Sequence, residues 1–382
     1  MYNKKLRNLT VIIFPLQKGS VVPLSNFLKI IDPFYDNIFV IAGAVEACDL
    51  EYNNKKLHRI NVVHISGTNV FTRIFNYVHT QIKLGKIIYK DITNSNLYVF
   101  HLGGENLSIP LIIVKLMGKK SLLIFGGYSG IISQACNDRF SYLQNLIIRV
   151  NLNIFDNILI YSEKVISNWA IEDGLLNKII ICINHLVDFN KFFKAKNLDK
   201  RQYSIGYIGR LSQEKGCLNF VESIPLLINK HRLKVVIGGE GPLRDKIEKY
   251  ICMNHLEATI DFTGWVPHNA LNECLNDIRL LVVPSYTEGL PNIILESMAC
   301  GTPVLATPVG AIPDIIKDGE TGFLMESNSS DCIAANIVRA LEHPDLESIA
   351  QHARDLVESE FTFERAVERW RKVLEEVDDD GR

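Results

Sequence analysis

Short apolar runs alternate with amphipathic segments along the whole chain, and this alternation most constrains the fold. Each apolar run is typical of a buried strand, and each amphipathic segment is typical of a helix. An alternation of strand and helix predicts parallel sheets with right-handed crossovers. At 382 residues, the chain is too long for one ordinary hydrophobic core. The sequence therefore predicts an α/β protein with two doubly wound, Rossmann-like domains.

The predicted domains are residues 1–187 and 203–358, followed by a C-terminal helical segment at 359–382. Residues 188–202 hold four lysines and an arginine without an apolar period, which favours an interdomain linker. Strands are predicted at 9–14, 38–42, 61–65, 97–101, 121–125, 157–161 and 179–183, then at 204–208, 234–238, 259–263, 280–283, 303–306 and 322–325. Helices are predicted at 70–84, 109–117, 217–228, 292–301 and 362–376.

Composition favours a packed, soluble protein in a reducing, cytoplasmic compartment. Apolar residues make up 47% of the chain. The eight cysteines are scattered without a C-x-x-C pair, so neither a zinc site nor a disulfide framework is indicated. No stretch approaches the ~18 apolar residues of a membrane span, and the N-terminus leads into a strand and not into a signal-peptide core.

The net charge of −2 hides an asymmetry between the two halves. Residues 1–200 hold 23 basic and 14 acidic residues, a charge of +9, and the remaining 18 basic and 29 acidic residues give −11. The basic half suggests a surface for anionic lipid or a phosphate-bearing acceptor, with Lys115, Lys119 and Lys120 as candidate contacts. A scatter of solvated lysines explains the charge equally well. Nucleic acid is disfavoured, because no dense basic run with interleaved aromatics occurs.

Residues 286–296 carry two glutamates around a Gly-Leu-Pro-Asn turn. The turn lies between a predicted strand and a predicted helix, so the N–H groups of the first helical turn form a candidate anion site. Glu288 lies in the loop and Glu296 within the helix. Taken singly, either glutamate could be a solvated surface charge.

A second segment, residues 205–216, contains a strand, a Gly-Arg turn and a Lys-Gly pair before the next helix. Arg210 offers a planar fork of donors and Lys215 a mobile point charge, a combination that suits two linked phosphates. Alternatively, both cations could pair with Glu214 or Glu240 in a surface network.

Together, these two segments resemble the donor-binding half of the family 4 retaining glycosyltransferases (glycosyl transferases group 1), which have the GT-B fold. The resemblance runs from about Tyr203 to the C-terminus. It implies two Rossmann-like domains facing across a cleft, with the last helix crossing back to the first domain. It also implies transfer of a hexose from a UDP- or GDP-linked sugar to a saccharide or lipid-linked acceptor, in cell-surface polysaccharide, lipopolysaccharide or glycolipid synthesis.

The resemblance also assigns roles in donor binding. Arg210 and Lys215 would bind the diphosphate, Glu288 a hydroxyl of the transferred sugar, and Glu296 the ribose hydroxyls. The backbone near Val266 would read the base edge. The implied donor-binding set is Gly19, Gly209, Arg210, Lys215, Gly239, Val266, Glu288, Gly289, Leu290, Pro291, Asn292 and Glu296.

The first half departs from the family pattern in the loop after its first strand. Relatives carry a glycine pair there, whereas this chain keeps only Gly19, next to Lys18. His101 ends a predicted strand where many relatives place an active-site histidine, although a purely structural strand-end histidine fits equally well. Ser162 matches a family serine, but a helix N-cap explains it fully.

The implied catalytic residues are Glu288, His101, Arg210 and Lys215. No Asp-x-Asp motif marks the donor site, so the sequence predicts no metal and no cofactor besides the donor substrate. The resemblance implies same-face attack in which the leaving phosphate helps to deprotonate the acceptor. The alternative is a nucleotide-sugar binding protein without turnover, which the altered first loop motivates.

Overall fold

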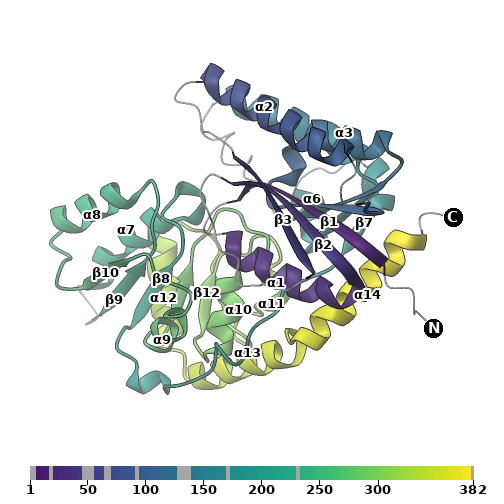
Figure 1. The fold of residues 1–382 in the computed structure, drawn as a ribbon. Helices are drawn as coiled ribbons and strands as arrows, with labels where there is room; N and C mark the ends of the chain where they lie inside the picture. The colour runs from purple at the N-terminus through teal and green to yellow at the C-terminus, as the bar shows by residue number, and fades with distance from the viewer. Residues whose placement is uncertain are drawn as a thin grey trace. The chain divides into compact units, whose positions relative to one another are not determined.

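The structure is a computed structural model that describes residues 6–16, 20–44, 56–63, 70–90, 94–126, 139–168, 173–228 and 233–379. The chain divides into two compact units (Figure 1). The first unit takes in residues 1–126, 136–185 and 366–382. The second is formed mainly by residues 186–365.

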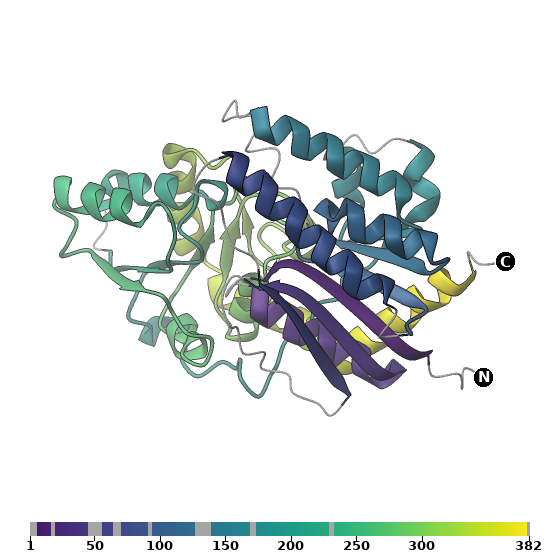
Figure 2. The ribbon, with the colours of Figure 1, turned by 45° about the horizontal axis from the view of Figure 1, so that its top comes forward.

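The first unit is built on a seven-stranded parallel sheet in the order β3-β2-β1-β4-β5-β6-β7. Topology and Figure 2 place α2, α3 and α5 over one face, while α1 lies on the other face. The strands are β1 (Leu6–Leu16), β2 (Tyr35–Ala44), β3 (Leu57–Val63), β4 (Leu97–His101), β5 (Lys120–Phe125), β6 (Asn157–Ile160) and β7 (Ile179–Ile181). The helices are α1 (Val21–Ile31), α2 (Val70–Tyr89), α3 (Ser108–Leu116), α5 (Arg139–Ile154) and α6 (Glu163–Asn168).

The second unit has a six-stranded parallel sheet in the order β10-β9-β8-β11-β12-β13. Its strands are β8 (Ile205–Ile208), β9 (Val235–Gly238), β10 (Ile260–Gly264), β11 (Leu281–Val283), β12 (Val304–Ala306) and β13 (Phe323–Leu324). Its helices are α7 (Cys217–Ile228), α8 (Arg244–Met253), α9 (Leu271–Asn276), α10 (Asn292–Ala299), α11 (Ile312–Ile315), α12 (Ser330–Leu341) and α13 (Leu346–Glu360). The last helix, α14 (Phe363–Asp379), starts in this unit and continues into the first.

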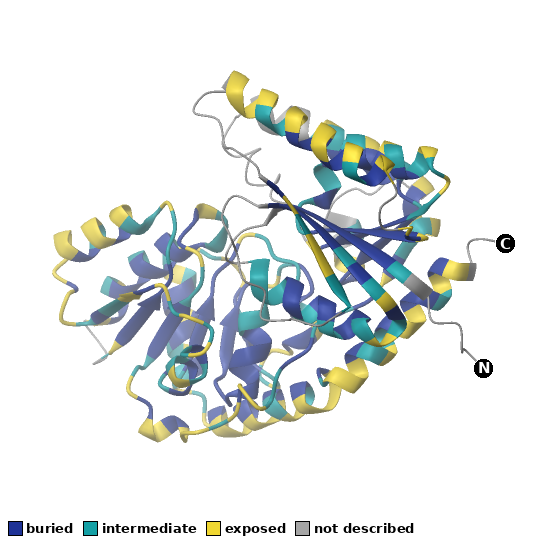
Figure 3. Ribbon diagram, viewed as in Figure 1, coloured by how far each residue is buried: buried dark blue, intermediate teal, exposed yellow. Residues whose placement is uncertain are grey.

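The predicted fold class is confirmed, since both sheets are parallel and doubly wound. The central strands of both sheets are buried, whereas the edge strand β3 and the outer faces of the helices carry exposed residues (Figure 3). The largest difference in a strand is β3, which begins at Leu57 and not at the predicted residue 61. Leu57 already pairs with Ile38 of β2, so partner hydrogen bonds extend the strand beyond its most apolar part.

Residues 188–202 are packed within the second unit. Phe192 and Leu198 are buried there, as is the guanidinium of Arg201. Burial lowers the pKa of Arg201 to about 10, so the side chain stays charged at neutral pH. The guanidinium donates hydrogen bonds to the backbone oxygens of Lys196, Leu275, Ile278, Cys300 and Gly301 and to the hydroxyl of Thr302. Arg201 thereby satisfies several carbonyls that would otherwise be buried without a partner.

Candidate active site

The strand order of the second sheet reverses between β8 and β11. In open α/β sheets, ligands bind beyond the carboxyl ends of the strands at such a switch point. Both predicted donor segments lie there, because one follows β8 and the other follows β11.

Lys215 and Glu288 form an ion pair across this switch point. The Nζ of Lys215 lies 2.6 Å from Oε1 and 2.8 Å from Oε2 of Glu288. The Ser285 hydroxyl donates to Oε1 at 2.7 Å. The Glu288 side chain is only 9% exposed, whereas that of Lys215 is 29% exposed. In this pair, the ammonium group of Lys215 is therefore accessible to a ligand, whereas the carboxylate of Glu288 is enclosed.

Backbone contacts hold the two loops together. Gly216 has φ +65°, and a Cβ atom there would lie 2.0 Å from the carbonyl oxygen of Pro284. The N–H of Tyr286 donates to the carbonyl of Glu214 at 2.9 Å. Only glycine at position 216 permits this approach without a shift of the β11 loop.

Arg210 is exposed at the start of the β8 loop. Its carbonyl accepts a hydrogen bond from the Tyr207 hydroxyl at 2.8 Å. The surface network considered from the sequence is not observed among the described residues, because Glu214 accepts from Ser212 and Glu240 pairs with Arg244. The guanidinium of Arg210 therefore remains available to a ligand.

Glycines also bring the β8 and β9 loops into contact. The N–H of Gly209 donates to the carbonyl of Gly238 at 3.0 Å. A Cβ atom on Gly239, which has φ +147°, would lie 1.8 Å from the carbonyl oxygen of Gly209. Val266, after β10, packs closely against Gly238. A Cβ atom added to Gly238 would lie 2.7 Å from Cγ2 of Val266.

The loop before α10 is supported by the loop after β12, a contact that the sequence did not reveal. The carbonyl of Gly289 accepts from the N–H of Ala311 at 2.8 Å. Gly310 has φ +57°, and a Cβ atom there would lie 2.1 Å from the carbonyl oxygen of Glu288. Pro291 then has extended backbone, and α10 begins at Asn292. These contacts hold the loop of residues 288–292 in place, and this loop leads directly into the first N–H groups of α10.

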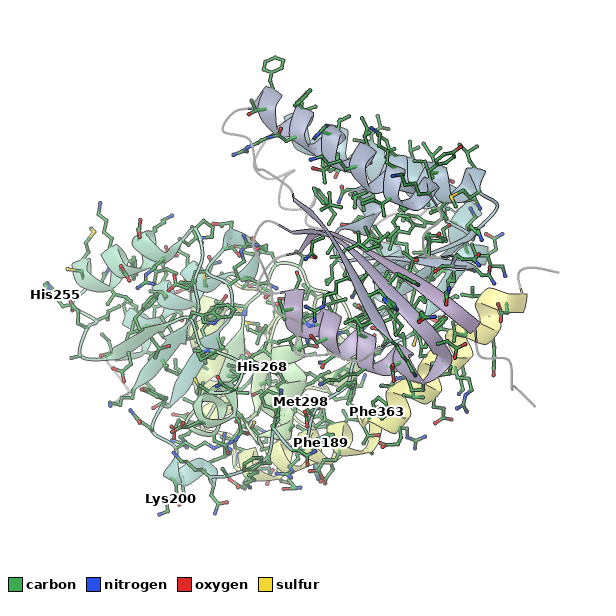
Figure 4. All side chains as sticks on the ribbon, viewed as in Figure 1. Phe189, Lys200, His255, His268, Met298 and Phe363 are labelled. Atoms are coloured by element: carbon green, nitrogen blue, oxygen red, sulfur yellow. The ribbon has the colours of Figure 1, made fainter. Side chains whose placement is uncertain are left out.

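Glu296 is buried on α10, where its Oε1 lies 3.1 Å from Nε2 of His268. His268 follows β10 and stacks edge-on against Phe192 (its position is labelled in Figure 4). Sequence reasoning missed His268, although it directly follows the Trp-Val-Pro segment after β10. The enclosed carboxylate of Glu296 can accept hydrogen bonds from hydroxyl groups.

His101 belongs to the first unit, where the strand order reverses between β1 and β4. It is the last residue of β4, is buried, and lies 5.3 Å from Phe27 between ring centroids. Burial lowers the pKa of its imidazole to about 4, so the ring is neutral at neutral pH. Gly19 and Lys18 lie outside the described residues. The hydroxyl of Ser162 accepts from the N–H of Lys164 at 3.2 Å, as the helix-cap interpretation predicts.

Among the residues that the structure describes, no three His, Cys, Asp or Glu side chains gather as metal ligands. Within the same residues, no helix is both long enough and apolar enough to cross a bilayer.

Comparison with known proteins decides the family. Residues 188–356 match the model of the glycosyl transferases group 1. The chain is 24% identical to the N-acetyl-alpha-D-glucosaminyl L-malate synthase of Bacillus anthracis, over 89% of this chain and 88% of that protein. Residues 188–356 form a domain of the group 1 glycosyltransferases.

Two further proteins are similar to this glycosyltransferase. A capsular polysaccharide biosynthesis glycosyltransferase of Staphylococcus aureus is 25% identical over 52% of this chain and 55% of its own length. The Anabaena protein HepE, solved with UDP and glucose, has a TM-score of 0.75 at 15% identity and covers 97% of this chain and all of its own. The second likeness concerns the fold alone, which is GT-B.

Proposed function

We propose that this glycosyltransferase moves a hexose from a UDP- or GDP-sugar to a saccharide or lipid-linked acceptor, with retention of configuration. The Lys215–Glu288 pair at the switch point carries the proposal. Lys215, together with Arg210, supplies positive charge for the diphosphate. Glu288, held by Ser285, supplies acceptor oxygens for a sugar hydroxyl.

The proposed donor site extends from this pair to both sides. Gly209 and Gly239 keep backbone close to the phosphates, and the first N–H groups of α10 at Asn292 add partial positive charge. Glu296 accepts hydrogen bonds from the ribose hydroxyls. Val266 lies near the base. A UDP-sugar is the first donor to test, because HepE was solved with UDP and glucose.

The proposed reaction breaks the bond between the anomeric carbon and the phosphate oxygen. The acceptor oxygen attacks the same face of the sugar, and its proton moves to the leaving phosphate. Arg210, Lys215 and the helix N–H groups stabilise the charge that develops on that phosphate. We propose His101, whose imidazole is neutral, as a further catalytic residue in the first unit.

The S. aureus relative favours cell-surface polysaccharide synthesis as the process served, while glycolipid or lipopolysaccharide acceptors fit the same chemistry. We place the reaction on the cytoplasmic side of the plasma membrane. The six cysteines that the structure describes are all free, which fits a reducing compartment.

The test compares Arg210→Ala and Lys215→Ala with Lys249→Ala, an exposed lysine on α8. Each site variant removes a charge-assisted contact of roughly 1.5–3 kcal/mol, so the donor Kd should rise about 10- to 150-fold. Calorimetry with a panel of nucleotide sugars measures this, and the control should bind normally. Unchanged Kd in both site variants would refute the diphosphate assignment.

Turnover separates the enzyme from the alternative, a nucleotide-sugar binding protein. The wild-type protein should transfer the sugar or slowly hydrolyse the donor, and nuclear magnetic resonance of the product should show the donor's anomeric configuration. Tight donor binding without any turnover across a broad acceptor panel would instead support the binding protein.

A further inference from the structure

Several large apolar residues of helix α2 are exposed, and Figure 3 colours the exposed positions of this helix yellow. Phe71 is 86% exposed, Phe75 70% and Tyr89 75%. Removing large apolar side chains from water is favourable, so an exposed stripe of them is a costly surface feature. The residues of the stripe are Phe71, Phe75, Val78, Ile82 and Tyr89, with Ile74 beside it.

Put as a binding constant, removing each exposed phenyl ring from water favours association by a factor of about ten or more.

The exposed stripe is regular. Phe71, Phe75, Val78 and Ile82 follow one another at intervals of four, three and four residues, and Tyr89 lies seven residues further on. On an α-helix this spacing places all five side chains along one line. A second line of the same spacing, displaced by one residue, holds His79, Lys83, Lys86 and Lys90, all exposed.

The opposite side of α2 is fixed to the first unit. Thr80, Gln81, Leu84 and Ile88 are buried. The Gln81 side chain accepts a hydrogen bond from the N–H of Ile109, next to the start of α3, at 3.0 Å. The apolar stripe is therefore not a displaced core face, because α2 already buries a different one.

The neighbouring helices extend this surface. Ile112 and Leu116 on α3 and Leu146 and Val150 on α5 are also exposed. Ten of the 19 large apolar side chains that are exposed in the described part of the chain lie on α2, α3 and α5. We call the outward surface of these three helices the α2 face.

Charge decides what can cover the α2 face. None of the three helices contains an aspartate or glutamate, whereas Arg73, Lys83, Lys86 and Arg149 are exposed on them. A second copy of the chain, packed about a two-fold axis, would set these cations against themselves. An anionic lipid surface instead complements both the cationic line and the apolar stripe.

We propose that the α2 face docks this glycosyltransferase onto an anionic lipid bilayer. Phe71, Phe75 and the rest of the stripe enter the boundary between headgroups and acyl chains, while Lys83 and Lys86 contact lipid phosphates. The α2 face is distant in sequence from most of the proposed donor residues, so membrane docking does not depend on the proposed reaction.

This assignment corrects the residues that the sequence suggested for membrane contact. Lys115 forms an ion pair with Asp156, and the Nζ of Lys120 donates to the carbonyl of Val377 at 2.6 Å. Both lysines therefore hold elements of the first unit together. By contrast, within the described part of the chain no hydrogen bond or ion pair involves the side chain of Lys83 or Lys86 of α2.

The test is sedimentation of the full chain with vesicles of phosphatidylcholine alone or with about 30% phosphatidylglycerol. The wild-type protein should bind the anionic vesicles, and added salt should weaken binding because the Debye length shortens. The double variant Phe71→Ser/Phe75→Ser should lower the partition coefficient at least about a hundredfold, because two rings are lost. Lys83→Gln/Lys86→Gln should lower it and reduce its dependence on salt.

Matched controls lie on the second unit. Leu226→Ser/Met253→Ser removes exposed apolar side chains, and Lys246→Gln/Lys249→Gln removes exposed lysines. Neither should change vesicle binding. Equal binding to neutral and anionic vesicles would overturn the proposal, as would a concentration-dependent dimer that the Phe71→Ser/Phe75→Ser change abolishes. Normal donor binding by that variant would separate this result from any failure of the proposed reaction.

Discussion

His101 shows how one buried side chain couples stability to pH. Its folded pKa of about 4 lies below the ordinary value of 6.5, because burial disfavours the imidazolium. The unfolded chain therefore binds the proton more tightly. The contribution to the free energy of unfolding is on the order of 3 kcal/mol above pH 6.5, declines below that pH, and is lost once the pH falls past about 4.

Replacing His101 with glutamine should therefore flatten the pH dependence of stability between pH 6.5 and 4. Urea denaturation at several pH values measures the effect. The control is His352→Gln, which changes an exposed histidine on α13. If the wild-type protein and His101→Gln lose stability in parallel across this range, the buried-imidazole account is wrong.

At the scale of elements, the proposed donor site depends on how closely the β8 and β11 loops approach. Gly216 and Gly319 both have positive φ, +65° and +75°. A Cβ atom on Gly216 would lie 2.0 Å from the Pro284 carbonyl oxygen, whereas one on Gly319 would have no atom within 4 Å among the contacts found. The two positions share the backbone strain of a non-glycine residue and differ in crowding.

Gly216→Ala should consequently destabilise the protein by about 1–3 kcal/mol more than Gly319→Ala. It should also weaken donor binding, because the added methyl group displaces the loop that carries Glu288. Urea midpoints and donor calorimetry on both variants measure these effects. Equal destabilisation by the two substitutions would show that the loops can separate without cost.

At the scale of the whole molecule, the charge that faces the donor phosphates is proposed to come from the protein. Arg210, Lys215 and the N-terminus of α10 would neutralise the diphosphate, and no Asp-x-Asp motif marks the predicted donor segments. Transfer activity should therefore remain within about twofold of its initial rate in excess EDTA. A complete loss that Mg²⁺ restores would assign part of this task to a metal ion.

Local sequence patterns are enough to predict most of the elements and the candidate residues of the proposed donor site. Buried strands are apolar runs bounded by glycine and polar residues, so β4 and α7 were predicted with their observed ends. Lys215 and Glu288 were each recognisable from their local segments. Such features depend on neighbouring residues, which the sequence states directly.

Which of these residues meet depends on the order of the strands in the folded sheet. Lys215 and Glu288 are 73 residues apart, and they pair because β8 lies beside β11 in the sheet. The contacts of Glu296 with His268 and of Gly310 with Glu288 depend on the same strand order. The α2 face escaped prediction for a related reason: its helical period permits several apolar faces, and only packing against α3 determines which one is buried.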